Sequence, residues 1–447
     1  MKLKAVIGTF CITCSIGSAV HAAVGASDID RLGKDLTPIG AEKAGNKDGT
    51  IPAWTGGMTK PPAGWDREKG YVDPFASEKP LFTITGANAG QYKDHLTAGQ
   101  QEMLKRYPSY QIRVFPTHRT AAYTQSVYDL AKQQALKVHL ASGGNGVMDS
   151  GKSNVPFPIP QSGIEVLWNH LMRFVGGEFL RYSADMPVQA DGGYTVGTRT
   201  ETVAMASVLP DAERNRILYY IQQLTAPSNV AGQAILVHEP IDQVKESRLA
   251  WQYNPGLRRI IKAPDLAYDS PGIGVDGLRT NDDLNGYNGS PDRYTWKLLG
   301  KKEIYIPFND YKLADRTAKY KDIVMPHHLN PNYTRYELHR VWVVEGELKP
   351  GMRHIYKKRV FYIDEDTWGI TLGDQYDGRG ELWRSKELFF IQGYDQINPV
   401  PVAEVTYDFQ ARRYLVGGLN NEEKMYKFGL NLNLEDFSPN ALRRLGN

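Results

Sequence analysis

The sequence is poor in cysteine and nearly balanced in charge. It has 2 cysteines in 447 residues, and 53 Lys and Arg stand against 50 Asp and Glu. Both cysteines, Cys11 and Cys14, fall in an N-terminal segment that is expected to be removed, so the mature chain has no residue for a disulfide, a thiolate nucleophile or a cysteine metal site. Loss of Lys2 and Lys4 with that segment takes the 53 basic residues to 51. Non-specific nucleic-acid binding needs a strongly basic surface, and this near-neutral composition argues against it.

The first 22 residues have the pattern of a secretory signal peptide. A short basic start precedes an apolar run from Ala5 to Val20, and the small residues of AVHA predict cleavage after Ala22. The run is shorter than the ~20 residues of a membrane-spanning helix, so a membrane anchor is the less favoured alternative. The residues before the two cysteines do not match a lipoprotein signal, and no lipidation is expected. The mature protein is therefore expected to be exported.

Aromatic and turn-forming residues are abundant, with 26 Tyr, 8 Trp, 43 Gly and 26 Pro. This mixture favours strands joined by tight turns over a helical bundle. Residues 23–95 are rich in Gly, Pro and Lys and predict an extended N-terminal arm lying over a core, with a disordered tail as the alternative. Apolar stripes predict helices at 97–107, 121–141 and 164–174, and a short C-terminal helix is expected after Ser438.

From about residue 175 the hydrophobic pattern changes to period two. About eleven segments rich in β-branched and aromatic residues follow one another, separated by turn signals such as Pro255-Gly256 and Asp377-Gly378. Consecutive strands with short connections predict a large antiparallel meander, and a sheet this wide tends to curl. Residues 96–447 are therefore expected to form one α+β domain, mainly β. In this half-barrel a large curved antiparallel sheet, an unclosed barrel, wraps around the helices.

The sequence motifs do not assemble a catalytic or metal site. Gly146 to Ser153 matches the phosphate-loop pattern G-x-x-x-x-G-K-[ST], but prolines follow it where the motif requires a helix. There is no G-x-S-x-G elbow and no H-E-x-x-H. His170 is expected to be a buried structural histidine rather than a proton-transfer group. Asp282 and Asp283 lie in a Gly- and Asn-rich loop, where a paired-acid role stays open without a predicted partner. We predict no catalytic residue, metal or cofactor.

The stretch RLAWQYNPGLRRI, Arg248 to Ile260, combines two aromatics, a Pro-Gly pair and three arginines. Period two places Leu249, Trp251 and Tyr253 on one strand face. The residues from Asn254 to Leu257 suit a type II turn, with Pro at its second position and Gly at its third. The stretch therefore predicts a hairpin, not a phosphate clamp, and its aromatics are available to an apolar ligand.

Four passages resemble the bacterial family catalogued as domain of unknown function 1329, and they span nearly the whole mature chain: 36–57, 107–122, 156–174 and 336–368. The resemblance implies a fold like that of the periplasmic lipoprotein carriers LolA and LolB. The hairpin is similar to a segment of outer-membrane lipoprotein-sorting relatives in which an aromatic strand turns at a proline into an arginine pair, matching Trp251, Tyr253, Pro255, Arg258 and Arg259. Relatives are often encoded near outer-membrane barrel proteins and inner-membrane transporters of the resistance-nodulation-division type. This implies a periplasmic location, possible association with the outer membrane, and such proteins as partners.

The favoured function is a non-enzymatic periplasmic carrier for a lipid, a lipoprotein acyl chain or another hydrophobic molecule in transport between the inner and outer membranes. An unclosed barrel leaves an apolar concave face, where a ligand chain replaces water at ~0.8 kcal/mol per buried CH₂. Candidate ligand-binding residues, with ordinary core packing as the alternative, are Leu249, Trp251, Tyr253, Val341 and Val343. An envelope enzyme acting on a lipid, ester or glycan would instead show titratable groups converging in a cleft. A structural adaptor between envelope proteins would show a large exposed apolar patch.

Overall fold

The structure is a computed structural model that describes residues 24–263 and 268–445. The predicted signal peptide, residues 1–22, lies outside the described residues. Within the described part of the chain, no helix combines the length and the apolar character that crossing a membrane requires.

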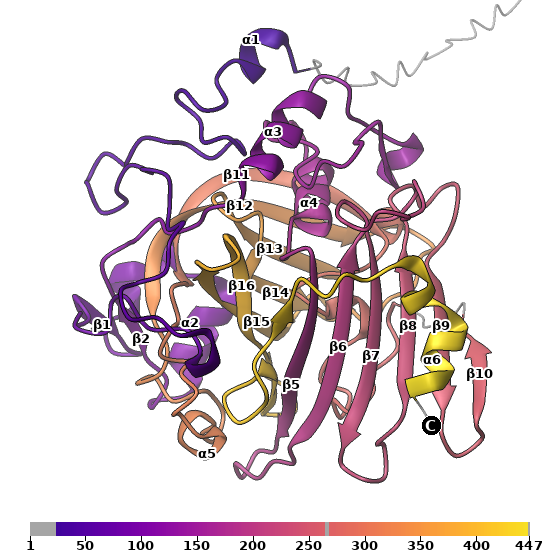
Figure 1. Ribbon diagram of the computed structural model, residues 1–447. Helices are drawn as coiled ribbons and strands as arrows, with labels where there is room; N and C mark the ends of the chain where they lie inside the picture. Colours follow the sequence, from indigo (N-terminus) through magenta and orange to yellow (C-terminus); the bar gives the residue numbers. More distant parts are fainter. Residues whose placement is uncertain (1–23, 264–267, 446–447) are drawn as a thin grey trace, which may run out of the picture.

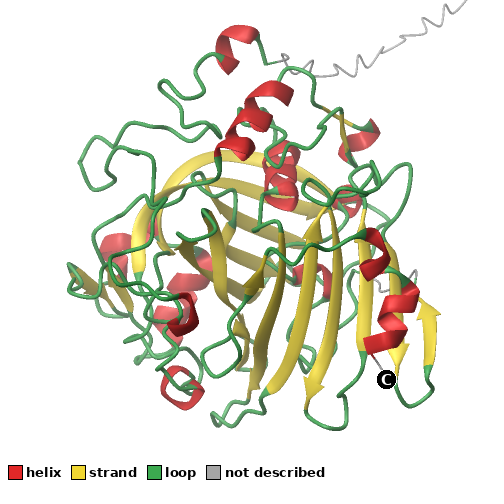
Figure 2. Ribbon diagram, viewed as in Figure 1, coloured by secondary structure: helices red, strands yellow, loops and turns green. Residues whose placement is uncertain are grey.

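The described strands form one sheet of 16 strands and a separate strand pair, β3–β4. The large sheet curves strongly without closing, because its strand order runs from β1 at one end to β10 at the other (Figures 1 and 2). Helices and loops lie around it. This confirms the prediction of a mainly β fold with helices and a large curved sheet that is not closed into a barrel.

The sheet consists of two antiparallel meanders joined side by side. They meet where β17 pairs with β5, so β10 and β11, which follow each other in the chain, are not neighbours. The expectation that sequence neighbours pair is right within each meander and wrong at this crossover. The first meander contains β5 (Glu178–Val188), β6 (Gly197–Met205), β7 (Leu218–Ala226), β8 (Ala234–Glu239), β9 (Leu249–Asn254) and β10 (Arg259–Lys262).

The second meander begins after residues 268–293, which we call the crossover loop. Its strands are β11 (Tyr294–Pro307), β12 (Tyr336–Leu348), β13 (Lys358–Asp364), β14 (Ile370–Tyr376), β15 (Leu382–Gly393), β16 (Asn398–Asp408) and β17 (Arg413–Leu419). Short strands complete the two sheets: β1 (Phe82–Ile84), β2 (Ile112–Val114), β3 (His139–Leu140), β4 (Val147–Met148) and β18 (Lys427–Phe428).

Two of the helices begin at residues whose side chains cap them. Thr97 and Gln100 form a reciprocal capping box at the start of α2 (Ala98–Arg106), and the Ser162 hydroxyl accepts the Glu165 N–H at the start of α4 (Gly163–Met172). A Cβ added to Gly163 would lie 2.7 Å from the carbonyl carbon of Lys297, so α4 packs directly on the backbone of β11. The other helices are α1 (Ala26–Ile29), α3 (Gln125–Gln134), α5 (Tyr320–Ile323) and α6 (Pro439–Leu445).

Helix α3 is shorter than the predicted segment 121–141. It ends at Gln134, whose carbonyl accepts the N–H groups of Lys137 and Val138 in a turn. The chain then enters β3, which pairs with β4 within the phosphate-loop pattern at Gly146 to Ser153. No helix follows that pattern among residues 149–162, so the segment lacks the helix N-terminus that holds phosphate in a nucleotide site.

Residues 24–95 lie along the protein surface with little regular structure (Figure 1). The Trp54 indole N–H donates to the carbonyl of Ala121 at 3.0 Å, and the Trp65 ring packs edge-on against Tyr394 with centroids 5.7 Å apart. Short elements within this segment include η1 (Arg67–Lys69) and η2 (Ala89–His95). These two tryptophans attach the segment to the core.

The first meander is covered on both faces. On its convex face, Tyr219, Leu236 and Tyr253 pack with Phe437 and Leu442 of the C-terminal segment, which contains η6 (Leu434–Phe437) and α6. Figure 1 shows α6 lying across β8 and β9. The opposite, concave face is turned toward the crossover loop and the second meander.

The hairpin β9–β10 confirms the strand–turn–strand prediction, but its turn is not the predicted type II. Arg259 pairs with Asn254, which leaves four residues, 255–258, in the loop. The residue with positive φ is Arg258 (48°), not Gly256. The reason is local, because the Asn254 side-chain oxygen accepts the N–H groups of Gly256 and Leu257 and bends the chain before the predicted turn can form.

Candidate functional site: a cavity on the concave face

A cavity of about 210 Å³ lies between the concave face of the first meander, the crossover loop and strands β15–β17. Its wall follows from strand alternation, since every second side chain of β5–β8 points inward. The inward residues are Phe179, Arg181, Arg199, Glu201, Val203, Leu218, Tyr220, Gln222, Ile235, Val237 and Glu239. An apolar cavity of about 150 Å³ can hold benzene, so this one admits a somewhat larger apolar group or a section of a chain.

One part of the cavity is apolar. Side chains from both meanders, from helix α4 and from the segment that carries β18 contribute to it. They are Leu171, Val175, Phe179, Val203, Leu218, Ile235, Val237, Leu388, Val400, Pro401, Ala403 and Phe428. Such a surface gains about 25 cal/mol for each Å² of apolar area that a ligand removes from water.

The other part of the cavity is polar and strongly basic. Arg181 pairs with Glu201 at 2.6 Å, and Arg248 pairs with Glu239 at 2.6 Å. Arg199 lies 3.3 Å from Glu201 and also pairs with Asp185, which is outside the lining. Two further arginines, Arg173 and Arg279, belong to the polar lining, as do asparagines of the crossover loop.

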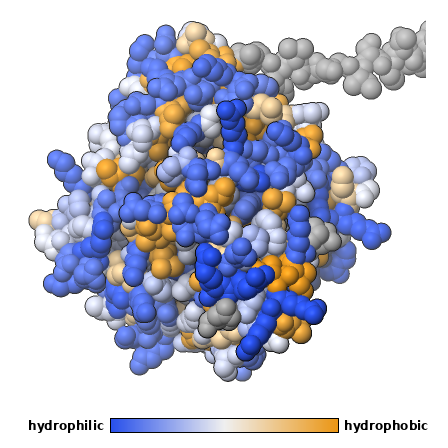
Figure 3. All heavy atoms as spheres, turned by 45° about the vertical axis from the view of Figure 1, so that its right-hand side comes forward, coloured by the Kyte–Doolittle hydropathy of each residue, from blue (hydrophilic) through white to orange (hydrophobic). Residues whose placement is uncertain are grey.

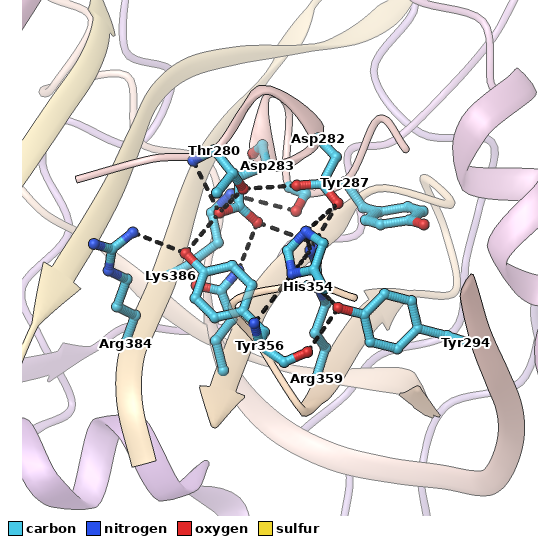
Figure 4. Close-up of polar contacts among 12 residues, drawn as sticks. Thr280, Asp282, Asp283, Tyr287, Tyr294, His354, Tyr356, Arg359, Arg384 and Lys386 are labelled. Atoms are coloured by element: carbon cyan, nitrogen blue, oxygen red, sulfur yellow. Dashed lines mark hydrogen bonds and ion pairs between the residues drawn. The ribbon is translucent and has the colours of Figure 1, made fainter. Parts of the chain in front are cut away.

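The crossover loop is held in place by a buried ionic network (Figure 4). Asp282 accepts from Arg359 at 2.7 Å, and Asp283 accepts from Tyr356 at 2.9 Å and from Gln375 at 2.6 Å. Both carboxylates are almost fully buried. The network ties the loop to β13, β14 and β15, which leaves the loop's next residues, Leu284 and Asn285, at the cavity wall.

Asp282 and Asp283 are not arranged as a catalytic acid pair. Burial by itself would raise the pKa of Asp283, but the charges of Lys386 and Arg359 outweigh it, so that pKa is lowered. A general acid near neutral pH needs the opposite shift. Neither carboxylate lines the cavity, and their hydrogen bonds are directed at protein groups. The two acids therefore serve to anchor the crossover loop.

His170 is buried among backbone groups. Its Nε2 donates to the Tyr287 carbonyl at 3.1 Å, and its Nδ1 accepts the Ile370 N–H at 3.1 Å. Burial, reinforced by the charge of Arg173, holds the pKa of His170 well below its usual range. A neutral, fully hydrogen-bonded imidazole fits the structural role expected from the sequence.

A second buried group brings together His339, Asp364 and Asp366, whose side-chain oxygen and nitrogen atoms are close enough to share a cation. These groups already have charged partners. His339 lies 3.0 Å from Asp364 and 3.4 Å from Glu337, and Arg119 pairs with Asp366 at 2.7 Å. Burial by itself would lower the pKa of His339, but the hydrogen bonds to Asp364 and Glu337 raise it to about 10. The imidazolium thus supplies a positive charge to these carboxylates.

The five residues proposed from sequence lie away from the cavity. Leu249, Trp251 and Tyr253 share one face of β9, as expected, but it is the convex face, where Trp251 and Tyr253 pack against the C-terminal segment. Val341 and Val343 of β12 are buried in the core between the second meander and helices α3 and α4. None of the five is among the described residues that line the cavity, so a ligand contact for them stays a prediction.

The sequence pattern does not single out the cavity residues, although the period-two alternation contains them. The segment GQAILVHEP predicts a strand, and its alternation separates Ile235 and Val237 from Leu236 and His238. Both sets are apolar enough to be core. Which set faces the cavity depends on the C-terminal segment that covers the other, and the local pattern does not contain that information.

Comparison with known proteins places these features in a family. Residues 83–443 match the family described as "Protein of unknown function (DUF1329)". The chain is 49% identical over 437 residues, 96% of each chain, to "Uncharacterized protein PA3922" of Pseudomonas aeruginosa.

Three solved structures are similar at low identity. A putative outer membrane lipoprotein-sorting protein domain from Vibrio parahaemolyticus aligns with TM-score 0.45 and 15% identity over 63% of this chain and 98% of that one. A DUF1329 family protein from Desulfovibrio piger aligns with TM-score 0.41 and 13% identity, over 60% and 92% of the two chains. A LolA superfamily protein from Nitrosomonas europaea aligns with TM-score 0.39 and 14% identity, over 63% and 100%. The match over residues 83–443 and the relative at 49% identity establish that the chain belongs to the DUF1329 family.

Proposed function

We propose that the protein is a non-enzymatic carrier that holds a hydrophobic molecule in the cavity of its concave face. The observation that carries the proposal is the cavity itself, whose apolar part is built by inward side chains of strands from both meanders. Ligand pockets are usually concave and mostly apolar, with a few polar groups that orient the ligand. The lining described here has that composition.

The charged groups favour a carrier over an enzyme. An active site usually holds acids or bases whose pKa values are shifted toward their task and which face a substrate. In the lining, Glu201 and Glu239 are paired with arginines, and Glu404 is paired with Lys386 at 2.6 Å. The pKa of Glu201 is lowered, although burial opposes this, because Arg181 and Arg199 stabilise the carboxylate. Burial raises the pKa of Glu239, although Arg248 opposes the shift. Each glutamate that lines the cavity in the described structure is thus bound to a cation of the wall.

The face shown in Figure 3 is less suited to an adaptor. On the face shown in Figure 3, hydrophobic side chains form several small patches divided by hydrophilic ones. A stable contact between envelope proteins would favour one large apolar patch. The apolar surface that is best organised for binding is the cavity lining.

The proposal also includes the periplasm as the compartment and the two membranes between which the ligand is carried. The predicted signal peptide favours the periplasm, with a ligand that passes between the inner and outer membranes as a lipid or as the acyl chain of a lipidated protein. An inner-membrane transporter of the resistance-nodulation-division type and an outer-membrane barrel protein stay predicted partners.

The test is to express the full chain with its own signal peptide and to purify the exported protein from an envelope extract. Native mass spectra are then recorded before and after organic extraction. We expect a bound species of constant mass that the extraction removes. Titration of the extracted protein with 1-hexadecanol, followed by displacement of a polarity-sensitive dye, should then show saturable binding. If no apolar species copurifies and neither the dye nor 1-hexadecanol binds, the carrier function is wrong.

A further inference from the structure

Two arginines in the cavity lining lack an anionic partner. Arg173 follows the last residue of α4 and is 6% exposed. Its Nη1 donates to the His170 carbonyl at 2.6 Å, while its Nη2 is buried with no hydrogen-bond partner among the described residues. Arg173 forms no ion pair within the described part of the chain, and its printed hydrogen bonds are to His170.

Arg279 is the second such residue. It lies on the crossover loop and is 7% exposed, and its Nε has no hydrogen-bond partner in the described structure. Its guanidinium is placed beside two glycines of the lining, since a Cβ at Gly272 or Gly417 would lie 3.7 Å from Nη2 or 3.8 Å from Nη1. Asp185 is within electrostatic reach, but among the described residues it pairs with Arg199 and not with Arg279.

The other cations of the lining differ from these two. Arg181, Arg199 and Arg248 each have a carboxylate partner. The remaining acid of the lining, Glu404, is used by Lys386 and also accepts the Asn285 N–H at 2.8 Å. Each lining glutamate is therefore engaged, and neither Arg173 nor Arg279 forms an ion pair with a described residue.

Both unpaired arginines lie near the same wall of the cavity, formed by β16 and β17. The charge of Glu404 on β16 acts on Arg173. Gly417 of β17 is opposite Glu404 in register and lies beside the Arg279 guanidinium. Burial lowers the pKa of Arg173 to about 10, so its guanidinium is still protonated at neutral pH.

Buried charges that lack an ion pair are costly for a folded protein, because burial removes their hydration. The cost is removed when an anion binds, and guanidinium groups form strong charge-assisted bonds to carboxylates and phosphates. The apolar wall of Phe179, Val203 and Val237 lines the same cavity.

We propose that the cavity binds an amphipathic anion, whose carboxylate or phosphate is held by Arg173 and Arg279 while its hydrocarbon chain lies on the apolar wall. This inference rests on the proposed carrier function and specifies the chemical class of its ligand.

The test compares ligands that differ only in charge, by displacement of a polarity-sensitive dye from the extracted full chain. Palmitate is paired with 1-hexadecanol, and a lysophosphatidate with the monoacylglycerol of the same chain. Inorganic phosphate is the chain-free anion. We expect the wild type to bind at least one anionic amphiphile about 10-fold or more tightly than its neutral partner, as expected for hydrogen bonds to a charged group. Preference for palmitate or for lysophosphatidate identifies the acidic group as carboxylate or phosphate.

The variants are Arg173→Met, Arg279→Met and the double variant, each expected to lose most of that preference while keeping the affinity for 1-hexadecanol. Arg279→Lys keeps the charge and should keep part of the preference. Arg413→Met is the control, because Arg413 is on the same strand as Gly417 but outside the lining and pairs with Asp276 at 2.6 Å.

Thermal unfolding of the ligand-free variants separates binding from a structural role. Removing an uncompensated buried charge should leave Tm unchanged or raise it. The inference is overturned if 1-hexadecanol and palmitate bind equally and lysophosphatidate binds no better than its neutral partner. It is also overturned if inorganic phosphate alone competes as well as the amphiphiles, or if the arginine variants lose stability and keep the preference. Loss of all binding, neutral ligands included, would instead refute the carrier function.

Discussion

Leu236 and Val237 are neighbours on β8, yet their side chains enter different compartments. Leu236 is fully buried on the convex face with Tyr219 and Tyr253, beneath the C-terminal segment. Val237 lies on the concave face and lines the cavity. Variants at these two neighbouring residues therefore test stability and ligand binding separately.

Filling the cavity from Val237 should reduce binding without unfolding the protein. For Val237→Phe we expect at least about 10-fold weaker binding of apolar ligands and a change in unfolding free energy within ~1.5 kcal/mol, since the larger ring enters open space. Leu236→Ala should do the reverse and cost ~2–5 kcal/mol with unchanged affinity. Urea unfolding and dye displacement measure both quantities. Equal loss of binding in the two variants would contradict the assignment of the two faces.

The His339 ion pairs predict a loss of stability at alkaline pH. The pKa of His339 is raised to about 10 in the folded protein, from an ordinary value of 6.5. The folded state therefore keeps a proton that the unfolded state releases, so the contribution is complete below pH ~6.5 and falls as the pH rises toward 10, by on the order of a few kcal/mol. Urea unfolding at pH 6.5 and 9 should show this decline.

The matched variants identify the group responsible. His339→Gln should have a lower unfolding free energy than wild type at pH 6.5, and this difference should be smaller at pH 9. His139 is exposed, so His139→Asn should follow the wild-type curve at each pH. A gap that stays constant between pH 6.5 and 9 would mean that His339 is not protonated in the fold.

The raised pKa of Asp374 also predicts that stability falls as the pH rises, in a lower pH range. Burial raises its pKa to about 7 from 3.8, although the Gly99 N–H and the Ser385 hydroxyl donate to it and oppose the shift. A folded acid that retains its proton loses stability as the pH rises from ~4 to ~7, because the unfolded carboxyl ionises first. Asp374→Asn imitates the protonated carboxyl. It should be close to wild type at pH 4 and ~1–4 kcal/mol more stable at pH 8.

The check is the unfolding free energy of both proteins across that range. Asp48→Asn is a control at an exposed acid. A variant that is destabilised equally at pH 4 and pH 8 would show that Asp374 is needed as a carboxylate.

The network that anchors the crossover loop should be sensitive to a single substitution. Asp283→Asn leaves Arg359 and Lys386 partly uncompensated in the interior, and breaking such a pair costs ~3–5 kcal/mol. The lowered pKa of Asp283 means that the carboxylate contributes above the unfolded pKa of 3.8 and that its contribution is lost as the pH falls, so the gap should narrow below pH ~4. Thermal unfolding at pH 7 and 3.5 measures this.

Asp276→Asn is the matched control in the same loop. Its ion pair with Arg413 is at the surface, with the Asp276 side chain 52% exposed, and such pairs contribute ~0–1 kcal/mol. Similar losses for the two variants would indicate that the loop is held by its backbone and not by the network.

Much of the secondary structure and the family could be predicted from the sequence, because these depend on local pattern. Apolar stripes predict helices at 97–107 and 164–174, close to the observed α2 and α4, and alternation predicts that Leu249, Trp251 and Tyr253 share one strand face. The turn at Asn254 was wrong in detail, since the side chain of Asn254 competes with the backbone geometry that Pro255-Gly256 favours.

The candidate site could not be predicted from local sequence pattern. Its polar part combines Arg173, from the end of α4, with Arg279, from a loop that the sequence presents only as rich in glycine and asparagine. The pairing of β17 with β5 closes the site, and nothing local to either strand specifies it. From the sequence, Arg173 and Arg279 cannot be distinguished from the lining arginines that form ion pairs. That distinction requires the positions of all the carboxylates.

The sequence by itself determined the two-residue alternation of the strands, the helix starts and the membership of the family, since hydrophobic period and capping act over a few residues. Only the tertiary structure decided which face became a cavity and which became core. That choice depends on Phe437 and Leu442 covering the convex face, and on Asp282 and Asp283 drawing the crossover loop over the concave one. Burial and ion pairing act between residues far apart in the chain, so their outcome is set only when the whole sheet has formed.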